Sequence, residues 1–204
     1  MFNSKSISQR RNFSKVYKNY VNGQWVASAG TSHIDIVNPL DSTAILGKVP
    51  QSTEAEFNAA VQNSVDTFES WKEVPIASRI RMMLKYQELL KQNSDDISKM
   101  IQIEHGKSLI DAQGDVFRGY EVVEHACSFG SLGMGETVEN VARNVDIYSF
   151  RKPLGVCAGI APFNFPAMIP LWMYPLAITL GNTFVLKPSE KVPGTTDILI
   201  DLLE

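Results

Sequence analysis

The chain has 204 residues, of which 44% are hydrophobic and 20% are charged, an ordinary composition for a soluble protein with a sizeable core. It contains two cysteines, too few for a disulfide-stabilised scaffold. The net charge of -3 becomes more negative once the basic N-terminus is set aside, and such an acidic body offers no basic stripe for nucleic acid.

Residues 1–15 form a basic, serine-rich leader, and the first acidic residue of the whole chain is Asp35. This composition is typical of a mitochondrial transit peptide, and apolar residues are too sparse in it for a secretory signal. The tripeptide at 11–13, ahead of Ser14, resembles a matrix-protease cleavage site, so we expect a location in the mitochondrial matrix. The alternative is an N-terminus without a targeting role.

Short strands are predicted next. Asn22-Gly23 is a dipeptide typical of two-residue β-hairpin turns, and apolar residues alternate on either side of it. Two further apolar segments follow before the first helix. The predicted strands cover 17–20, 24–27, 34–37 and 45–49.

The first helix is predicted to begin after Thr53. Thr53 and Glu56 have the spacing of a capping box, in which each side chain bonds to the other residue's backbone N–H. Apolar residues then recur at helical spacing, and we expect Phe57 and Val65 among them to lie in the core.

Three more helices are predicted. Pro75 opens the second, in which Leu84 belongs to the apolar stripe and Arg79 lies on a solvated, charged face. The third and fourth are predicted over 94–105 and 108–129. Three histidines are scattered along the chain without the carboxylate or cysteine spacing of a metal site, so no metal is expected.

The stretch from 152 to 187 has no charged side chain between its ends but contains five prolines. A membrane-spanning helix needs about 20 consecutive apolar residues, but Pro162 and Pro166 would leave backbone acceptors unpaired in the middle of such a helix. We therefore predict a parallel βαβ unit whose strands are buried on both faces. Its parts are a strand over 156–160, a helix over 167–180 and a strand over 183–186.

Ligands of open α/β sheets bind beyond the carboxyl ends of the strands. Residues 161–164 and 187–190 follow the two predicted strands, so we expect them to border one crevice. There, Glu190 can accept hydrogen bonds from both hydroxyls of a ribose, and Lys187 can donate to the sugar or to a phosphate. An exposed ion pair between Lys187 and Glu190 is an equally good interpretation of the spacing.

The segments PFNFP at 162–166 and KPSE at 187–190 resemble the cofactor domain of the aldehyde dehydrogenase superfamily, although most members have Trp at the position of Phe163. Residues 104–127 and 159–194 resemble the CoA-acylating, mitochondrial branch that acts on methylmalonate semialdehyde. The resemblance covers nearly everything after about residue 17.

The resemblance implies an α/β fold, namely an aldehyde-dehydrogenase-like N-terminal region with an incomplete Rossmann-type NAD-binding domain. Residues 16–136 correspond to its mainly helical N-terminal part. Residues 137–152 correspond to an arm that pairs with a neighbouring subunit, and residues 153–204 to the first βαβ unit. The catalytic domain is expected beyond Glu204.

The family's site residues map onto positions of this chain. Asn164 resembles the amide that stabilises the oxyanion, and Arg118 resembles the ligand of the substrate carboxylate. The residues that by resemblance border NAD or hold its adenosine ribose are Ala161, Phe163, Lys187, Glu190 and Lys191.

Two of these residues have simpler interpretations. Arg118 has the spacing of a surface ion pair with Asp115 or Glu121 on one helix. The simpler interpretation of Asn164 is a cap or turn residue ahead of the helix that Pro166 helps to start. The family's nucleophilic cysteine matches neither Cys127 nor Cys157 and is expected beyond the end of the chain.

The implied activity is NAD-dependent, CoA-acylating oxidation of methylmalonate and malonate semialdehyde to propionyl-CoA and acetyl-CoA, in valine and pyrimidine breakdown. NAD is the implied cofactor, coenzyme A a co-substrate and a homotetramer the assembly. The 204 residues alone are expected to be inactive, because the nucleophilic cysteine lies beyond their end. They are also expected to be poorly soluble, because two strands leave an open apolar sheet edge and an uncovered helix face. The alternatives are an interaction protein that joins full-length subunits through 137–150, and a nucleotide-binding module without chemistry.

Overall fold

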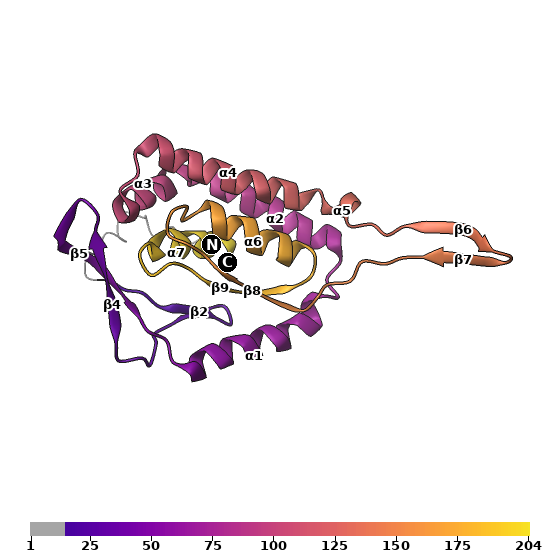
Figure 1. Cartoon of the computed structure of the whole chain (residues 1–204), viewed down its shortest axis with the longest axis horizontal. Helices are drawn as coiled ribbons and strands as arrows, with labels where there is room; N and C mark the ends of the chain where they lie inside the picture. The colour runs from indigo at the N-terminus through magenta and orange to yellow at the C-terminus, as the bar shows by residue number, and fades with distance from the viewer. Residues whose placement is uncertain (1–14) are drawn as a thin grey trace.

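The computed structural model of the chain describes residues 15–204 (Figure 1). The leader predicted over residues 1–15 lies outside the described residues, except for Lys15. Lys15 begins strand β1, Lys15–Val16, and its Nζ forms an ion pair with Asp197 of the last helix. The described chain is a mixed α/β structure with nine strands and seven helices.

The N-terminal strands form where the turn signals predict them. They are β2 (Asn19–Val21), β3 (Gln24–Val26), β4 (His33–Asn38) and β5 (Asp41–Pro50). The hairpin of β2 and β3 turns through Asn22 and Gly23, whose φ angles of 51° and 71° suit a two-residue turn. Strands β1, β5 and β4 form a three-stranded sheet in that order.

The predicted helices are confirmed, with ends that shift by one or two residues. They are α1 (Glu54–Trp71), α2 (Ile76–Gln92), α3 (Ser94–His105) and α4 (Leu109–Cys127). The short helix α5 (Phe129–Leu132) is not among the predicted ones. The capping box is present: the Thr53 N–H donates to Glu56 at 2.7 Å and the Glu56 N–H donates to Thr53 at 3.3 Å. Gly106 ends α3 with a φ of 80°.

The uncharged stretch forms the predicted parallel βαβ unit. Its elements are β8 (Val156–Ile160), α6 (Met168–Thr179) and β9 (Thr183–Lys187), and α7 (Pro193–Leu203) follows. β8 and β9 pair in parallel, and the two strands lie between α6 and α1 (Figure 1). Among residues 15–204, no helix has the length and hydrophobicity needed to cross a membrane.

The prediction that both strands are buried on both faces is wrong for β8. Ile160 is 78% exposed and Val156 is 36% exposed. β8 has β9 as its one neighbour in the described sheet, and both α1 and α6 contact β9 more extensively than β8. An apolar sequence alone does not distinguish an edge strand from a central one.

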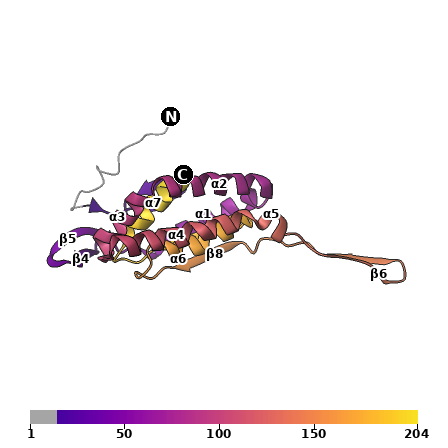
Figure 2. The same cartoon turned by 90° about the horizontal axis from the view of Figure 1, so that it is seen from above.

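A hairpin projects from the body of the molecule (Figures 1 and 2). It consists of β6, Thr137–Ala142, and β7, Val145–Tyr148, paired antiparallel. All residues of both strands are exposed, including Val138, Ile147 and Tyr148. The hairpin therefore has no packing partner within the described chain.

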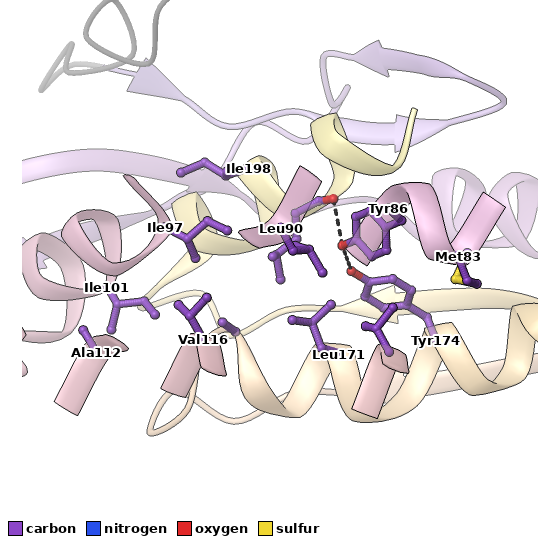
Figure 3. Close-up of a cluster of buried hydrophobic side chains, with 13 residues drawn as sticks. Met83, Tyr86, Leu90, Ile97, Ile101, Ala112, Val116, Leu171, Tyr174 and Ile198 are labelled. Atoms are coloured by element: carbon purple, nitrogen blue, oxygen red, sulfur yellow. Dashed lines mark hydrogen bonds between the residues drawn. The ribbon is translucent and has the colours of Figure 1, made fainter. Parts of the chain in front are cut away.

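The core lies where α2, α3, α4, α6 and α7 meet (Figure 3). At its centre, the Tyr174 hydroxyl bonds to that of Tyr86, which donates to the Leu199 carbonyl oxygen at 3.1 Å. Burial raises the pKa of both tyrosines, so both hydroxyls stay neutral. This chain of hydrogen bonds joins α2, α6 and α7 without placing a charge in the core.

Four side chains differ from the helical pattern predicted for α1 and α2. Phe57 and Val65 of α1 are 57% and 43% exposed instead of lying in the core, because one edge of α1 faces β8 and β9 and the rest faces solvent. In α2, Leu84 is 50% exposed, whereas Arg79, predicted on the solvated face, is buried at 8% exposure.

The backbone around Arg79 explains its burial. Its Nε donates to the Thr179 carbonyl at the end of α6, at 2.8 Å. Its Nη1 donates to the carbonyls of Trp71 and Lys72 at 3.4 Å, and also to that of Val74. The last carbonyls of a helix lack intrahelical partners and carry partial negative charge. One guanidinium thus satisfies the C-terminal ends of both α1 and α6.

A second buried charged group joins α3 to α7. Glu104 is 6% exposed, accepts a hydrogen bond from the Tyr17 hydroxyl at 2.9 Å, and accepts another from the Gly194 N–H at 2.9 Å. Burial raises the pKa of Glu104 to about 7, although both hydrogen bonds favour the charged form. This carboxyl therefore titrates near neutral pH.

Replacing Arg79 should destabilise the fold. We expect Arg79→Met to lower the free energy of unfolding by about 2 to 4 kcal/mol, because it leaves buried carbonyls without donors. Urea denaturation measures this change. The matched variant is Arg81→Met, at an exposed position of the same helix, which should change stability by less than about 0.5 kcal/mol. Equal effects of the two substitutions would contradict the assigned role.

Glu104 should make stability depend on pH. Its pKa rises from 4.5 to about 7 on folding, so its contribution is fully present below the unfolded value and is lost as pH rises through the folded value. From about pH 5 to about pH 8, we expect wild type to lose roughly 2 to 3 kcal/mol relative to Glu104→Gln. Urea denaturation at a series of pH values measures the free energy of unfolding of wild type and of Glu104→Gln. If the two free energies change with pH in parallel, the assigned role of Glu104 is wrong. Glu88→Gln, at an exposed glutamate, is the control.

Candidate functional site

The two loops predicted to border a crevice leave the sheet side by side. Ile160 is paired with Lys187 at the ends of β8 and β9, and the Ala161 N–H donates to the Lys187 carbonyl at 2.9 Å. The segment from 161 to 167 and the segment from 188 to 192 therefore start from the same edge of the sheet. Ala161 itself is buried at this junction.

A cavity of about 450 Å³ opens beside these loops. Three of the residues expected at the cofactor line it, namely Phe163, Glu190 and Lys191. The opposite wall comes from the first sheet and the end of α3, with Ile34, Asp35, Ile36, Val37, Pro39, Glu104 and His105. That second wall is not predictable from local sequence signals, because its residues come from other parts of the chain, namely 34–39 and the end of α3.

Phe163 is held from two sides. Its ring stacks on His105, with ring centroids 6.1 Å apart and an interplanar angle of 29°. The Lys191 Nζ lies 4.5 Å from the centroid of the Phe163 ring, within cation–π range. Burial lowers the pKa of His105, so its imidazole is neutral at neutral pH. These two contacts hold the Phe163 ring at the wall of the cavity.

Lys187 and Glu190 form the ion pair that their spacing allows, with Nζ and Oε2 3.2 Å apart. Their side chains are 58% and 39% exposed, and Lys187 also donates to the Pro188 carbonyl at 2.8 Å. Hydrogen bonds from its own backbone N–H and from Lys187 lower the pKa of Glu190. Glu190 is therefore an ionised acceptor on the cavity wall.

Asn164 does not cap the helix that follows it. α6 starts at Met168 without a capping bond from its own preceding side chains, and the Met168 N–H donates to Oδ1 of Asp115 at 2.7 Å. Within the described part of the chain, the exposed Asn164 amide makes no hydrogen bond. The capping alternative is therefore wrong, and the Asn164 NH2 group remains available to a ligand.

The surface ion pair suggested for Arg118 is also absent from the described residues. Asp115 is fully buried and pairs with Lys107, whose Nζ lies 2.9 Å from Oδ2 of Asp115. Arg118 is exposed on α4, and its carbonyl accepts a bond from Trp172 Nε1 of α6 at 3.3 Å. Within residues 15–204, the Arg118 guanidinium has no hydrogen-bond or ion-pair partner, although the Arg118 backbone is joined to α6.

Neither cysteine belongs to this cavity. Cys127 ends α4 and Cys157 lies in β8, and both are half-buried free thiols. Burial raises the pKa of Cys127, which makes it a poorer nucleophile at neutral pH. Across residues 15–204, no three His, Cys, Asp or Glu side chains lie close enough together to hold a metal ion.

Known proteins match the chain over most of its length. The mitochondrial, acylating methylmalonate-semialdehyde/malonate-semialdehyde dehydrogenase of Mus musculus is 53% identical over 187 residues, which make up 92% of this chain and 35% of that protein. The mitochondrial, acylating methylmalonate-semialdehyde dehydrogenase of Arabidopsis thaliana is 54% identical over 184 residues, or 90% of this chain and 30% of that protein. The chain thus spans about a third of the length of these curated relatives.

Solved structures agree with the sequence comparison. Methylmalonate-semialdehyde dehydrogenase from Oceanimonas doudoroffii has a TM-score of 0.89 and 40% identity, and the match covers 93% of this chain and 38% of that chain. A Sinorhizobium meliloti 1021 protein of the same assignment, solved in complex with NAD, has a TM-score of 0.90 and 35% identity over 94% of this chain and 39% of that chain.

These structures confirm the predicted fold class, an α/β N-terminal region like that of aldehyde dehydrogenases. The model of the aldehyde dehydrogenase family matches residues 25–204, which include β8, β9, the two loops beside the cavity and α6. The chain therefore belongs to the aldehyde dehydrogenase family.

Proposed function

We propose that the whole protein catalyses NAD-dependent, CoA-acylating oxidation of methylmalonate semialdehyde and malonate semialdehyde. The products are propionyl-CoA and acetyl-CoA, with loss of CO2. The observation that carries the proposal is the unengaged Asn164 amide on a loop fixed at the crevice. The names of the relatives supply the substrate class.

The crevice residues fit a dinucleotide. Glu190 is an ionised acceptor at the cavity wall, where it suits the two hydroxyls of a ribose, and Lys187 is a donor beside it. Phe163 and Lys191 line the same space, and Ala161 is buried at the start of the loop that leads to it. NAD held by these residues would supply the acceptor for the hydride released from the aldehyde carbon. Coenzyme A takes the acyl group in the proposed reaction.

Asn164 and Arg118 have separate tasks in this proposal. The Asn164 NH2 donates to the oxygen that gains negative charge as the aldehyde is attacked, which lowers the barrier by about 3 kcal/mol. The exposed Arg118 guanidinium binds the carboxylate at the other end of the semialdehyde in a bidentate manner. The nucleophile is not supplied by Cys127 or Cys157.

The exposed hairpin of β6 and β7 supports assembly into a homotetramer, because its apolar side chains lack partners in the described chain. We propose a location in the mitochondrial matrix. The relatives named above are mitochondrial, and the basic leader has the composition of a transit peptide. The same hairpin favours the second candidate function, a short interaction protein that joins full-length subunits. Co-purification of the 204-residue chain with a full-length dehydrogenase tests this second candidate.

Asn164→Ala should slow the oxidation step selectively. In the full-length enzyme we expect kcat with methylmalonate semialdehyde to fall about 100-fold, since the oxyanion loses a hydrogen-bond donor. The dissociation constant of NAD, from fluorescence titration, should stay within about twofold because the amide side chain is not needed to hold the ribose. Asn58→Ala, at an exposed position on α1, is the control. An unchanged kcat in Asn164→Ala would contradict the assigned role.

Arg118→Met should alter substrate selection. We expect kcat/KM for malonate semialdehyde to fall about 10- to 100-fold, whereas the value for propanal, which has no carboxylate, should change less than about threefold. Arg81→Met is the matched control at an exposed site. If both aldehydes lose activity to the same extent, Arg118 does not recognise the carboxylate.

A further inference from the structure

The loop that carries Asn164 is anchored at both ends. At its start, the Ala161 N–H donates to the Lys187 carbonyl of β9 at 2.9 Å. At its end, the Met168 N–H donates to Oδ1 of Asp115 at 2.7 Å. The first anchor continues the sheet ladder, but the second is a side chain of another helix, fully buried in α4.

Asp115 is in turn held by Lys107. Oδ2 of Asp115 lies 2.9 Å from the Lys107 Nζ, whose side chain is 12% exposed. The same Nζ lies 4.0 Å from the centroid of the Phe165 ring. A buried charge-assisted hydrogen bond is stronger than one between neutral groups. The cation–π contact between the Lys107 ammonium and the Phe165 ring adds further attraction. Lys107 therefore contacts both the anchor and the loop.

The two neighbours of Asn164 are both aromatic and both held. The Phe163 ring contacts both His105 and Lys191, and the Phe165 ring contacts Lys107. Asn164 between them is exposed and makes no hydrogen bond within the described chain. The surroundings fix the backbone of this residue while its amide stays unengaged.

We infer that Asp115 and Lys107 are positioning residues for the Asn164 amide: they hold the end of the loop and the Phe165 ring, and so fix where the NH2 group points. This inference rests on the proposed function of Asn164. The pair reaches no ligand itself, since Asp115 is fully buried and does not line the cavity.

Loss of the pair should affect rate more than binding. Asp115→Asn keeps the size of the side chain but removes the charge that pairs with Lys107 and strengthens the bond to Met168 N–H. A shift of about 1 Å in the oxyanion donor is enough to lower a rate about 100-fold. We expect NAD binding to depend on residues 161–163 and on the segment after β9. The hydrogen bond from the Ala161 N–H to the Lys187 carbonyl, which holds these two segments together, does not involve Asp115 or Lys107.

A double-mutant cycle in the full-length enzyme tests the inference. We expect Asp115→Asn and Lys107→Met each to lower kcat about 10- to 100-fold, with the NAD dissociation constant within about threefold of wild type. In the Asn164→Ala background, the same substitutions should cost less than about twofold, because the amide they position is gone. Lys107→Arg, which keeps the charge, should recover most of the rate. Lys85→Met and Glu88→Gln, from an exposed ion pair, are matched controls.

Equal losses in both backgrounds would overturn the inference, since a general loss of structure does not depend on Asn164. An unchanged kcat in Asp115→Asn would overturn it as well. Should Asp115→Asn fail to fold, Lys107→Met against Lys107→Arg decides the question in the same way.

A second measurement separates this inference from the proposed function. Amide hydrogen exchange in peptides covering 161–168 should be at least about tenfold faster in Asp115→Asn, with no change in peptides covering 183–187. Unchanged exchange at 161–168 would overturn the anchor even in an active enzyme. If the anchor is present but Asn164→Ala keeps the full rate, the proposed role of Asn164 fails, and with it the positioning role.

Discussion

The uncharged crossover helix α6 cannot satisfy its own ends, and the fold depends on charges that other helices bring to it. At the N-terminus, Asp115 of α4 accepts the Met168 N–H. At the C-terminus, Arg79 of α2 donates to the Thr179 carbonyl. An anion at the first turn and a cation at the last turn both match the direction of the helix dipole. This arrangement also fixes how α2 and α4 lie against α6.

Much of the fold can be predicted because its signals are local. Asn22-Gly23 specifies a turn, Thr53 with Glu56 specifies a helix start, and both are found in place. Burial is harder to predict, because it depends on what packs against an element. Arg79 looks like a surface residue in the helical pattern, and Ile160 looks like a core residue. Arg79 is buried because the end of α6, far along the chain, packs on it, and Ile160 is exposed because β8 has one neighbouring strand in the described sheet.

The site, like the fold, has one part that the sequence predicts and one part that it does not. Strand and loop spacing is enough to bring Phe163 and Glu190 to one cavity, and the structure places them there. The residues that hold the loop give no comparable signal. Asp115 looks like half of a surface ion pair on its helix, and Lys107 like a solvated charge between two helices. Their roles arise only when α4 packs against α6, because that contact excludes water around both charges.

The two charges that satisfy α6 face different evolutionary constraints. Arg79 bonds to backbone carbonyls, which every sequence has, so no second substitution elsewhere can compensate for its loss. Asp115 is tied to a backbone N–H and must remain an acceptor, but its other partner is a side chain. Either lysine or arginine can therefore occupy position 107, because both can pair with an acidic side chain at position 115. The identity of residue 79 is thus tied to the backbone, whereas the identity of residue 107 is tied to one other side chain.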